Sequence, residues 1–165
     1  MSEQQGHKVK DSIWKDVIEK HISGMLRRAI PELYRDMDKS KEPVFIDKEL
    51  RNWDQYVPGG AHEADFLVRI YLNDGSERWL LLHIEIQGDS GGYLPYRMYF
   101  YKTLILANHR IEPAALAVIT ESDHSKEPDC YISDIYGTRT EYRYNRLVIK
   151  DLDAEELYES DNPFD

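Results

Sequence analysis

Near the N-terminus, apolar residues recur at the spacing of one face of an α-helix. Asp11 or Ser12 can cap this helix, so we predict a helix over residues 12–30 that follows a polar tail over residues 1–10. Pro31 ends or kinks the helix, and the stretch after it can add another turn.

Two stretches with the alternation typical of β-strands, residues 64–72 and 77–87, flank the turn-forming sequence Asn73-Asp74-Gly75-Ser76. We therefore predict that they form an antiparallel hairpin at the centre of a sheet. An earlier strand is predicted over residues 44–50, ahead of a loop that contains Pro-Gly-Gly.

The second half of the chain continues with a helix, a strand and another hairpin. Residues 95–109 begin with a proline and are apolar on most sides, which predicts a largely buried helix. Residues 114–120 form a short apolar run typical of an inner strand, and the strand-helix-strand order implies parallel pairing with the strand before the helix. An added C-terminal hairpin is predicted from residues 131–136 and 140–149 around Gly137.

Length and composition agree with one packed domain. The chain has 165 residues, which is enough to bury a core, and we assign residues 11–165 to a single α/β domain with a mixed central sheet. Hydrophobic residues make up 41% of the chain, which argues against disorder, while 32% charged residues indicate a well-solvated surface. The single cysteine, Cys130, excludes an internal disulfide and a multi-cysteine zinc site.

The two ends of the sequence lead to expectations about location and length. The N-terminal stretch has no apolar segment of the signal-peptide kind, and no run approaches the length of a membrane span. We therefore expect a cytoplasmic protein without a membrane partner. The abrupt ending Asn-Pro-Phe-Asp is expected either of a natural short form or of a shortened chain.

The strand with the sequence LLHIEIQ has apolar flanks but carries polar side chains on one face. Alternation places His83, Glu85 and Gln87 together on that face. In an antiparallel hairpin whose turn is centred near Gly75, Asp65 lies opposite Glu85 to within about one residue. Two carboxylates from distant positions in the sequence are therefore expected to converge.

Two interpretations of this convergence stay open. Like charges in one site require either a raised pKa or a cation, and Mg²⁺ binds one or two carboxylates together with water and phosphate oxygens. Alternatively, Asp65 caps its strand, and Glu85 forms an ion pair with Arg97 or Lys102 of the following helix.

Asp65, the hairpin and the triplet Glu85-Ile86-Gln87 resemble the signature of PD-(D/E)XK nucleases, in the matching order of helix, three strands, helix and strand. More narrowly, the chain resembles a bacterial family of recombination-promoting, transposase-like nucleases, through ADFLVRIYLNDGSERWLLLHIEIQ, YRMYFYKTLILANHR and ESDNPFD. The resemblance runs from about Trp14 to the end of the chain. It implies a restriction-endonuclease-like core with an added C-terminal hairpin.

The resemblance also implies a function, a Mg²⁺-dependent DNA endonuclease in which Mn²⁺ can replace Mg²⁺. Asp65 and Glu85 would hold the metal, and the main-chain carbonyl of Ile86 would complete the protein ligands. The metal would polarise the scissile phosphate and lower the pKa of a bound water. Gln87 stands where most relatives have lysine, so it cannot supply positive charge, although it can hold a water. Ala64 stands where the superfamily name has proline.

Further residues are candidates for supporting roles. Arg97 and Lys102 on the second helix are predicted to bind phosphate near the metal. Glu19 on the first helix is a candidate for an additional acid, and the simpler interpretation is a solvated residue at the flank of the helix. His21 lies within the apolar stripe and fits a hydrogen-bonded core histidine better than a metal ligand.

The net charge of −10 limits what can be expected of DNA binding, because a polyanion is repelled by the chain as a whole. We therefore expect weak and steeply salt-dependent affinity, carried by the few arginines and lysines outside the acidic C-terminus. Cutting both strands of a duplex usually needs two active sites, which fits a homodimer.

Two other classes of function were weighed against the nuclease. His83-Ile84-Glu85 resembles the His-x-Glu element of zinc deaminases, but that chemistry needs two cysteine ligands and the chain has only Cys130. The other alternative is a catalytically inactive domain of the same fold that acts as an interaction or regulatory module. The acidic balance and Gln87 both favour this second alternative.

Overall fold

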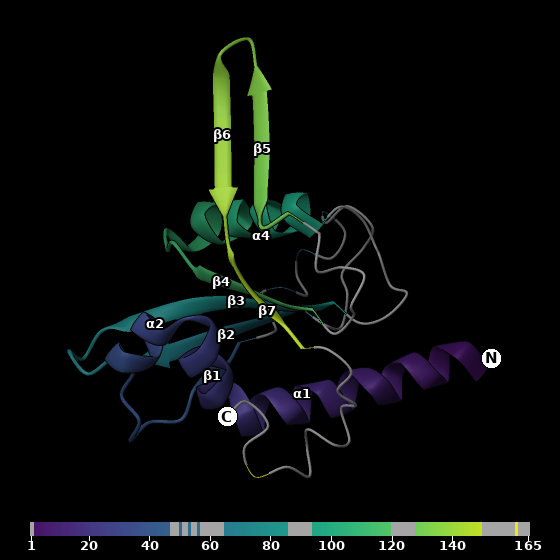
Figure 1. The fold of residues 1–165 in the computed structure, drawn as a ribbon, viewed down its shortest axis with the longest axis vertical. Helices are drawn as coiled ribbons and strands as arrows, with labels where there is room; N and C mark the ends of the chain where they lie inside the picture. Colours follow the sequence, from purple (N-terminus) through teal and green to yellow (C-terminus); the bar gives the residue numbers. More distant parts are fainter. Residues whose placement is uncertain are drawn as a thin grey trace.

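The computed structural model describes residues 2–46, 50, 53, 56, 65–85, 94–119, 128–149 and 161, with side chains for all of these except residues 2–15, 65, 84 and 85. The helices described along their whole length are α1 (Ser2–Ala29), α2 (Pro31–Asp36) and α4 (Leu94–His109) (Figure 1). The strands are β1 (Val44–Phe45), β2 (Asp65–Tyr71), β3 (Glu77–Glu85), β4 (Ala114–Ile119), β5 (Cys130–Ile135), β6 (Thr138–Arg143) and β7 (Asn145–Val148).

The described strands form two sheets. The larger sheet has five strands in the order β1-β2-β3-β4-β7, and the smaller one consists of β5 and β6. Strands β1, β2 and β3 pair antiparallel, whereas β4 is parallel to β3 and β7 is parallel to β4. The predicted mixed α/β fold and its central antiparallel hairpin are therefore confirmed. The predicted parallel crossover is confirmed as well, and its helix is α4.

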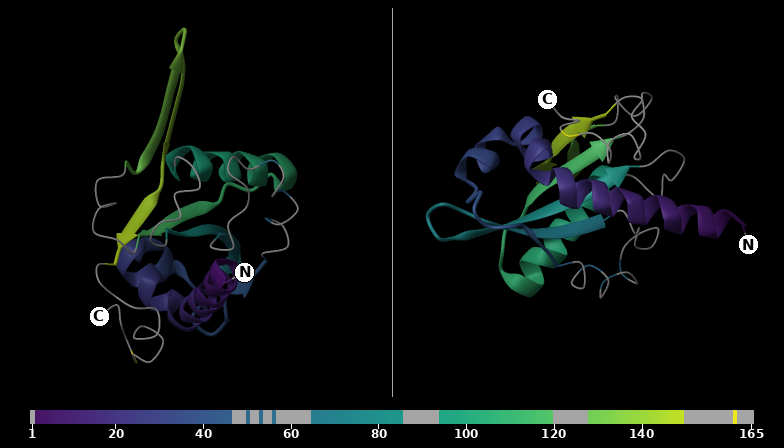
Figure 2. Two further views of the ribbon diagram at one scale, coloured as in Figure 1. Left: turned by 90° about the vertical axis from the view of Figure 1, so that its right-hand side faces the viewer. Right: turned by 90° about the horizontal axis from the view of Figure 1, so that it is seen from below.

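A helix covers each face of the larger sheet, and alternation along the strands decides which side chains each helix meets (Figure 2). Phe66, Val68 and Ile70 of β2 point into the core beneath α1, together with Leu80 and Leu82 of β3. The intervening residues point into the other core, beneath α4. That core contains Leu67, Leu81, Ala115 and Ala117 of the strands and Leu94, Met98, Tyr101 and Ile105 of the helix.

The two helices show how far local pattern fixes element boundaries. Helix α4 spans Leu94–His109, so the helix predicted over residues 95–109 is confirmed. The predicted helix start at residue 12 is wrong, because α1 begins at Ser2 and the polar stretch is helical. Residues 2–11 include glutamate, glutamine and lysine, which are good helix formers, and no proline. The helix therefore extends over them although they have no apolar face from which it could be predicted.

The first predicted strand needs correction. The strand expected over residues 44–50 is confirmed only at Val44 and Phe45, and its predicted end is wrong, because Leu50 is helical. The main-chain N–H of Ile46 still donates to the carbonyl of Leu67 at 2.8 Å. Residues 47–49 lie outside the described residues, as do residue 64 and residues 86 and 87 at the ends of the predicted hairpin.

The C-terminal hairpin is confirmed, but its second arm is two strands, not one. Strand β6 pairs with β5, and the chain then turns at Tyr144 and enters the larger sheet as β7. The Tyr144 N–H donates to the carbonyl of Asp129 at 3.1 Å, and its phenol donates to the carbonyl of Pro128 at 2.8 Å. These bonds hold the base of the smaller sheet while β7 continues beside β4.

A glycine sets the turn between β2 and β3. The N–H of Gly75 donates to the carbonyl of Leu72 at 3.0 Å, and Gly75 itself has a φ of +85°. A type I turn followed by a left-handed residue is a common three-residue hairpin connection. The carboxylate of Asp74 accepts bonds from the hydroxyl and N–H of Ser76, and these bonds lower the pKa of Asp74. None of the described helices is both long enough and apolar enough to cross a membrane.

We expect Gly75→Ala to lower the free energy of unfolding by about 1 kcal/mol, because an L-residue in the left-handed region meets its own carbonyl. No atom lies within 4 Å of the position a Cβ would take, so the cost is backbone strain alone. Gly75→Asn is the matched control and should lose about half as much or less, since asparagine tolerates this conformation. Urea unfolding followed by circular dichroism measures both, and an alanine variant at least as stable as the asparagine variant would contradict the account.

Candidate functional site

The register of β2 and β3 decides which polar residues meet at the open end of the hairpin. Asp65 pairs with His83, and the predicted pairing of Asp65 with Glu85 is off by two residues. The cause lies in the turn, because its centre is at Asp74 and not at Gly75, and moving the centre by one residue shifts the pairing by two. An even shift leaves every residue on its face, so the predicted convergence on one face survives.

Positions 65, 83 and 85 all belong to the face that α4 covers. Leu81, two residues before His83 on β3, packs into the core beneath α4. Glu85 is diagonal to Asp65 across the strand pair, and diagonal positions have Cα atoms about 7–8 Å apart. Side chains of aspartate and glutamate can reach a common point over that spacing.

His83 is the residue whose position the sequence analysis missed. It lies directly opposite Asp65 in the register and is only 3% exposed. The signal was present, since alternation had already placed His83 beside Glu85. The error in the turn centre hid its pairing with Asp65.

Arg97 brings a buried positive charge to the same end of the sheet. Because α4 runs back over the sheet between the parallel strands β3 and β4, its N-terminal end lies where those strands end (Figure 1). Arg97 is in the first turn of α4 and only 4% exposed, with its guanidinium carbon 5.6 Å from the centroid of the Tyr101 ring. A buried guanidinium requires negative charge close by, and Asp65 and Glu85 occupy positions on this face of the sheet.

Lys102, the second predicted phosphate ligand, has a different surrounding. Its ammonium lies 3.2 Å from the carboxylate of Glu112, in the loop that follows α4. This ion pair draws Lys102 toward the C-terminal end of the helix, away from the end where Arg97 lies. Its role in phosphate binding remains a prediction.

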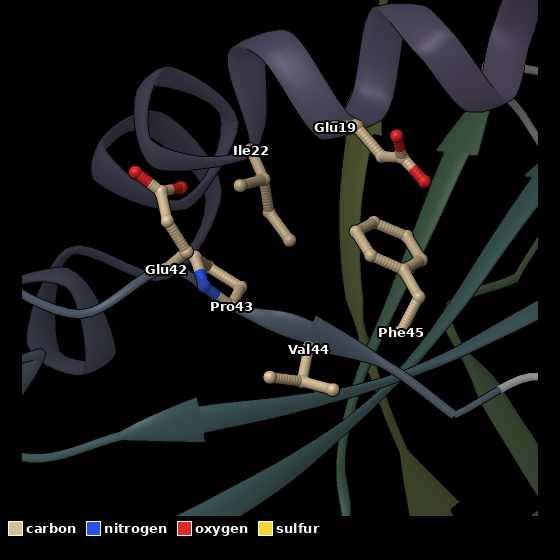
Figure 3. Close-up of a pocket in the computed structure, with 6 residues that line it drawn as sticks. All are labelled: Glu19, Ile22, Glu42, Pro43, Val44 and Phe45. Carbon is tan, nitrogen blue, oxygen red and sulfur yellow. The ribbon is translucent and has the colours of Figure 1, made fainter.

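Glu19 does not join the other acids. It is exposed and lines a pocket of about 380 Å³ between α1 and β1, on the opposite face of the sheet (Figure 3). In the close-up, Glu19 and Ile22 point from α1 toward Val44 and Phe45. The interpretation of Glu19 as a solvated flank residue agrees with this position. His21 is buried, as expected of a histidine in the apolar stripe.

Ile86 and Gln87, the predicted carbonyl ligand and water-holding residue, lie outside the described residues, so their roles remain predictions. Among the residues whose side chains are described, no three histidines, cysteines, aspartates or glutamates gather as metal ligands. The side chains of Asp65 and Glu85 are not in that set.

Comparison of the chain with protein-family models, with curated proteins and with solved structures found no match. The site is therefore interpreted from its own residues. It combines an aspartate and a glutamate at diagonal positions, a buried histidine opposite the aspartate, and a buried arginine at the start of the covering helix.

We expect Arg97→Met to lower the free energy of unfolding by about 3 kcal/mol in the presence of a chelator, because removing the cation of a buried ion pair leaves its partner uncompensated. Arg110→Met is the matched control, since Arg110 follows the same helix but is exposed, and it should change stability by less than about 0.5 kcal/mol. Urea unfolding measures both variants.

A double-mutant cycle tests the partner directly. In the Glu85→Gln background the cost of Arg97→Met should shrink by roughly 1 kcal/mol or more, since interacting residues are not additive. Equal costs in both backgrounds, or an Arg97 variant as stable as the Arg110 control, would show that the buried arginine does not depend on these acids.

Proposed function

We propose that the chain is a Mg²⁺-dependent DNA endonuclease whose catalytic site lies where β3 ends beneath the start of α4. The observation that carries the proposal is the placement of Asp65 and Glu85 on one face and at one end of the hairpin, with buried Arg97 on the helix above them. Two carboxylates in one site need either a raised pKa or a cation, and both an arginine and a metal ion can serve as the cation.

The donor set fits a hard divalent cation. Mg²⁺ takes oxygen ligands, usually one or two carboxylates with waters and substrate phosphate oxygens. Asp65 and Glu85 would hold the ion, and the carbonyl of Ile86, the next residue on the chain, would be the third protein ligand. Bound Mg²⁺ would polarise the scissile phosphate and make its water a better nucleophile.

The remaining residues of the site act on orientation and charge. Gln87 follows Glu85 at the spacing of one strand face, and its amide would hold the attacking water by donating one bond and accepting another. His83, opposite Asp65 and buried, would fix the aspartate at its end of the hairpin. Arg97 would balance the carboxylates and attract the phosphate.

A second candidate is supported by the surface charges. The net charge is −10, and the described arginines of β6 are held by acids: Arg139 lies 3.3 Å and Arg143 3.2 Å from the carboxylate of Glu141. Such ion pairs leave little positive potential for a DNA backbone. This favours a catalytically inactive interaction or regulatory module of the same fold, and the experiments below separate the two.

Asp65→Asn and Glu85→Gln should each reduce Mg²⁺-dependent cleavage of duplex DNA to background, since each removes charge that holds the ion. Under this proposal each variant would keep one carboxylate for Arg97 and relieve the repulsion between the two acids. Stability in a chelator should therefore stay within about 0.5 kcal/mol of the unmodified chain or rise slightly. Mg²⁺ at a hundredfold excess over its Kd should add about 2.7 kcal/mol to the unmodified chain and much less to either variant.

Cleavage assays with Mg²⁺, Mn²⁺ or chelator, and thermal unfolding under the same conditions, provide the two measurements. Cleavage that survives both substitutions would exclude this site. Loss of stability in both variants with no Mg²⁺ effect on the unmodified chain would instead favour the inactive module.

Affinity for duplex DNA should be weak and fall steeply with salt, because few cations oppose a large negative charge. Measured by fluorescence anisotropy in the Glu85→Gln background, Arg110→Ala should reduce the slope of log K against log salt by about 1. Arg139→Ala is the control and should change it little, since acids already offset Arg139. Tight binding that is insensitive to salt would contradict the electrostatic account.

A further inference from the structure

Exposed large hydrophobic side chains gather on two neighbouring elements. Within the described residues there are six, and all but Tyr56 belong to α4 or to the β5–β6 ribbon, residues 130–143: Tyr96, Leu106, Ile132, Ile135 and Tyr136. The ribbon stands on α4 and points away from the larger sheet (Figure 1, Figure 2). Tyr136 at its tip is fully exposed.

The two faces of the ribbon differ in charge. Cross-strand pairs share a face, and one face pairs Tyr131 with Tyr142, Ser133 with Thr140 and Ile135 with Thr138. None of these side chains is charged. We call these residues the uncharged ribbon face. The opposite face carries the acids and arginines of the ribbon, which pair with one another at 3.2–3.8 Å.

The outer side of α4 is uncharged as well. By helical angle it consists of Tyr96, Tyr99, Phe100, Thr103, Leu106 and Ala107, all exposed or half-buried. A helix that covers a sheet normally presents charged and polar residues to water. The hydroxyl of Thr103 already donates to the carbonyl of Phe100 at 2.7 Å. Covering Thr103 therefore costs little in lost hydrogen bonds to water.

The two uncharged surfaces meet at a corner. The ring of Tyr131 stacks on Tyr99 with centroids 4.8 Å apart, and Tyr96 lies 5.4 Å from Tyr131. Burial, together with the charge of Glu112, raises the pKa of Tyr142. We call the uncharged ribbon face and the outer side of α4 together the apolar corner.

We infer that the apolar corner is a homodimer interface, in which the uncharged ribbon faces of two copies pack against each other and each ribbon tip reaches the outer side of the partner's α4. An upright ribbon on a helix forms a corner, and two such corners related by a two-fold axis close on each other. In a two-fold interface the same patch serves both copies, so it must complement itself. This inference does not depend on the proposed nuclease activity.

Charge selects a second copy over other occupants. Two chains with a net charge of −10 repel each other, so they approach most favourably through a surface without charges. DNA is not favoured, because the apolar corner offers no lysine or arginine to phosphate groups. Apolar surface against apolar surface needs no complementary charges.

The size and stability of the ribbon agree with this occupant. Strands of six residues make a ribbon about 20 Å long and 10 Å wide, and α4 offers a strip of similar size. Two ribbon faces and two α4 strips of about 200 Å² each cover at most roughly 800 Å², since Tyr131 and Tyr142 already pack on Tyr99. This is less than the smallest standard interfaces, about 1,200 Å², so we expect a weak dimer. A two-stranded ribbon in water is marginally stable alone, and packing against a second ribbon would stabilise it.

Analytical ultracentrifugation of the full chain over a micromolar concentration series tests the proposal. We expect a monomer–dimer equilibrium without metal or DNA. Ile135→Lys, on the uncharged ribbon face, should raise the dimer dissociation constant about 30-fold or more. Ile132→Lys is the matched control, since Ile132 is similarly exposed on the charged face opposite Glu141, and it should leave the constant within about threefold.

A second pair tests the helix side. Ala107→Lys on the outer side of α4 should weaken the dimer as Ile135→Lys does. Asn108→Lys is the control and should not weaken it, because Asn108 is also exposed but lies about 100° around the helix from Ala107, off the outer side. Circular dichroism should show all four variants folded. A monomeric unmodified chain, or equal effects of Ile132→Lys and Ile135→Lys, would overturn the proposal. A monomer that loses DNA binding on Ile135→Lys would overturn it in favour of a nucleic-acid contact.

Discussion

The pairing of β2 with β3 is the interaction on which the rest of the structure depends. It brings together the two longest strands described in the larger sheet, and its alternation sorts their side chains beneath α1 or beneath α4. Because a strand repeats every two residues, a slip of one position would exchange the two cores and expose Leu80 and Leu82 to the wrong helix. Only a slip of two residues keeps each side chain in its own core. The turn type decides between registers that differ by two residues.

The three-residue turn makes that choice, and it also sets the chemistry at the other end of the hairpin. With Gly75 in the left-handed conformation, His83 is placed opposite Asp65 and Glu85 becomes diagonal to it. A conformational requirement at one end therefore determines which polar residues can share a cation at the other. The position of Arg97 depends on the parallel pairing of β3 and β4, because α4 begins near the end of β3 and carries Arg97 in its first turn.

Alternation and turn signals in the sequence were sufficient to predict the central hairpin, and two apolar stretches of different length were sufficient to predict α4 and β4. They were not sufficient for the register, because Asn-Asp-Gly fits several turn types and each type centres the hairpin differently. Likewise β6 and β7 form one alternating run in the sequence. Their separation at Tyr144 depends on bonds to Pro128 and Asp129, which are distant in sequence. The ion pair that engages Lys102 also depends on where the loop after α4 ends, which no local pattern specifies.

The apolar character of α4 was predicted to mean burial, and the fold only half satisfies that prediction. Met98, Tyr101 and Ile105 are buried against the sheet, while Tyr96 and Leu106 remain exposed on the outer side. Periodicity alone cannot distinguish a helix buried by its own chain from one buried by another chain, because both require apolar residues all round. The same ambiguity holds for the β5–β6 ribbon, whose alternation is typical of a sheet with one covered face. A second copy packed against α4 and the ribbon would bury the apolar side chains that the sequence places there and that a single chain leaves exposed.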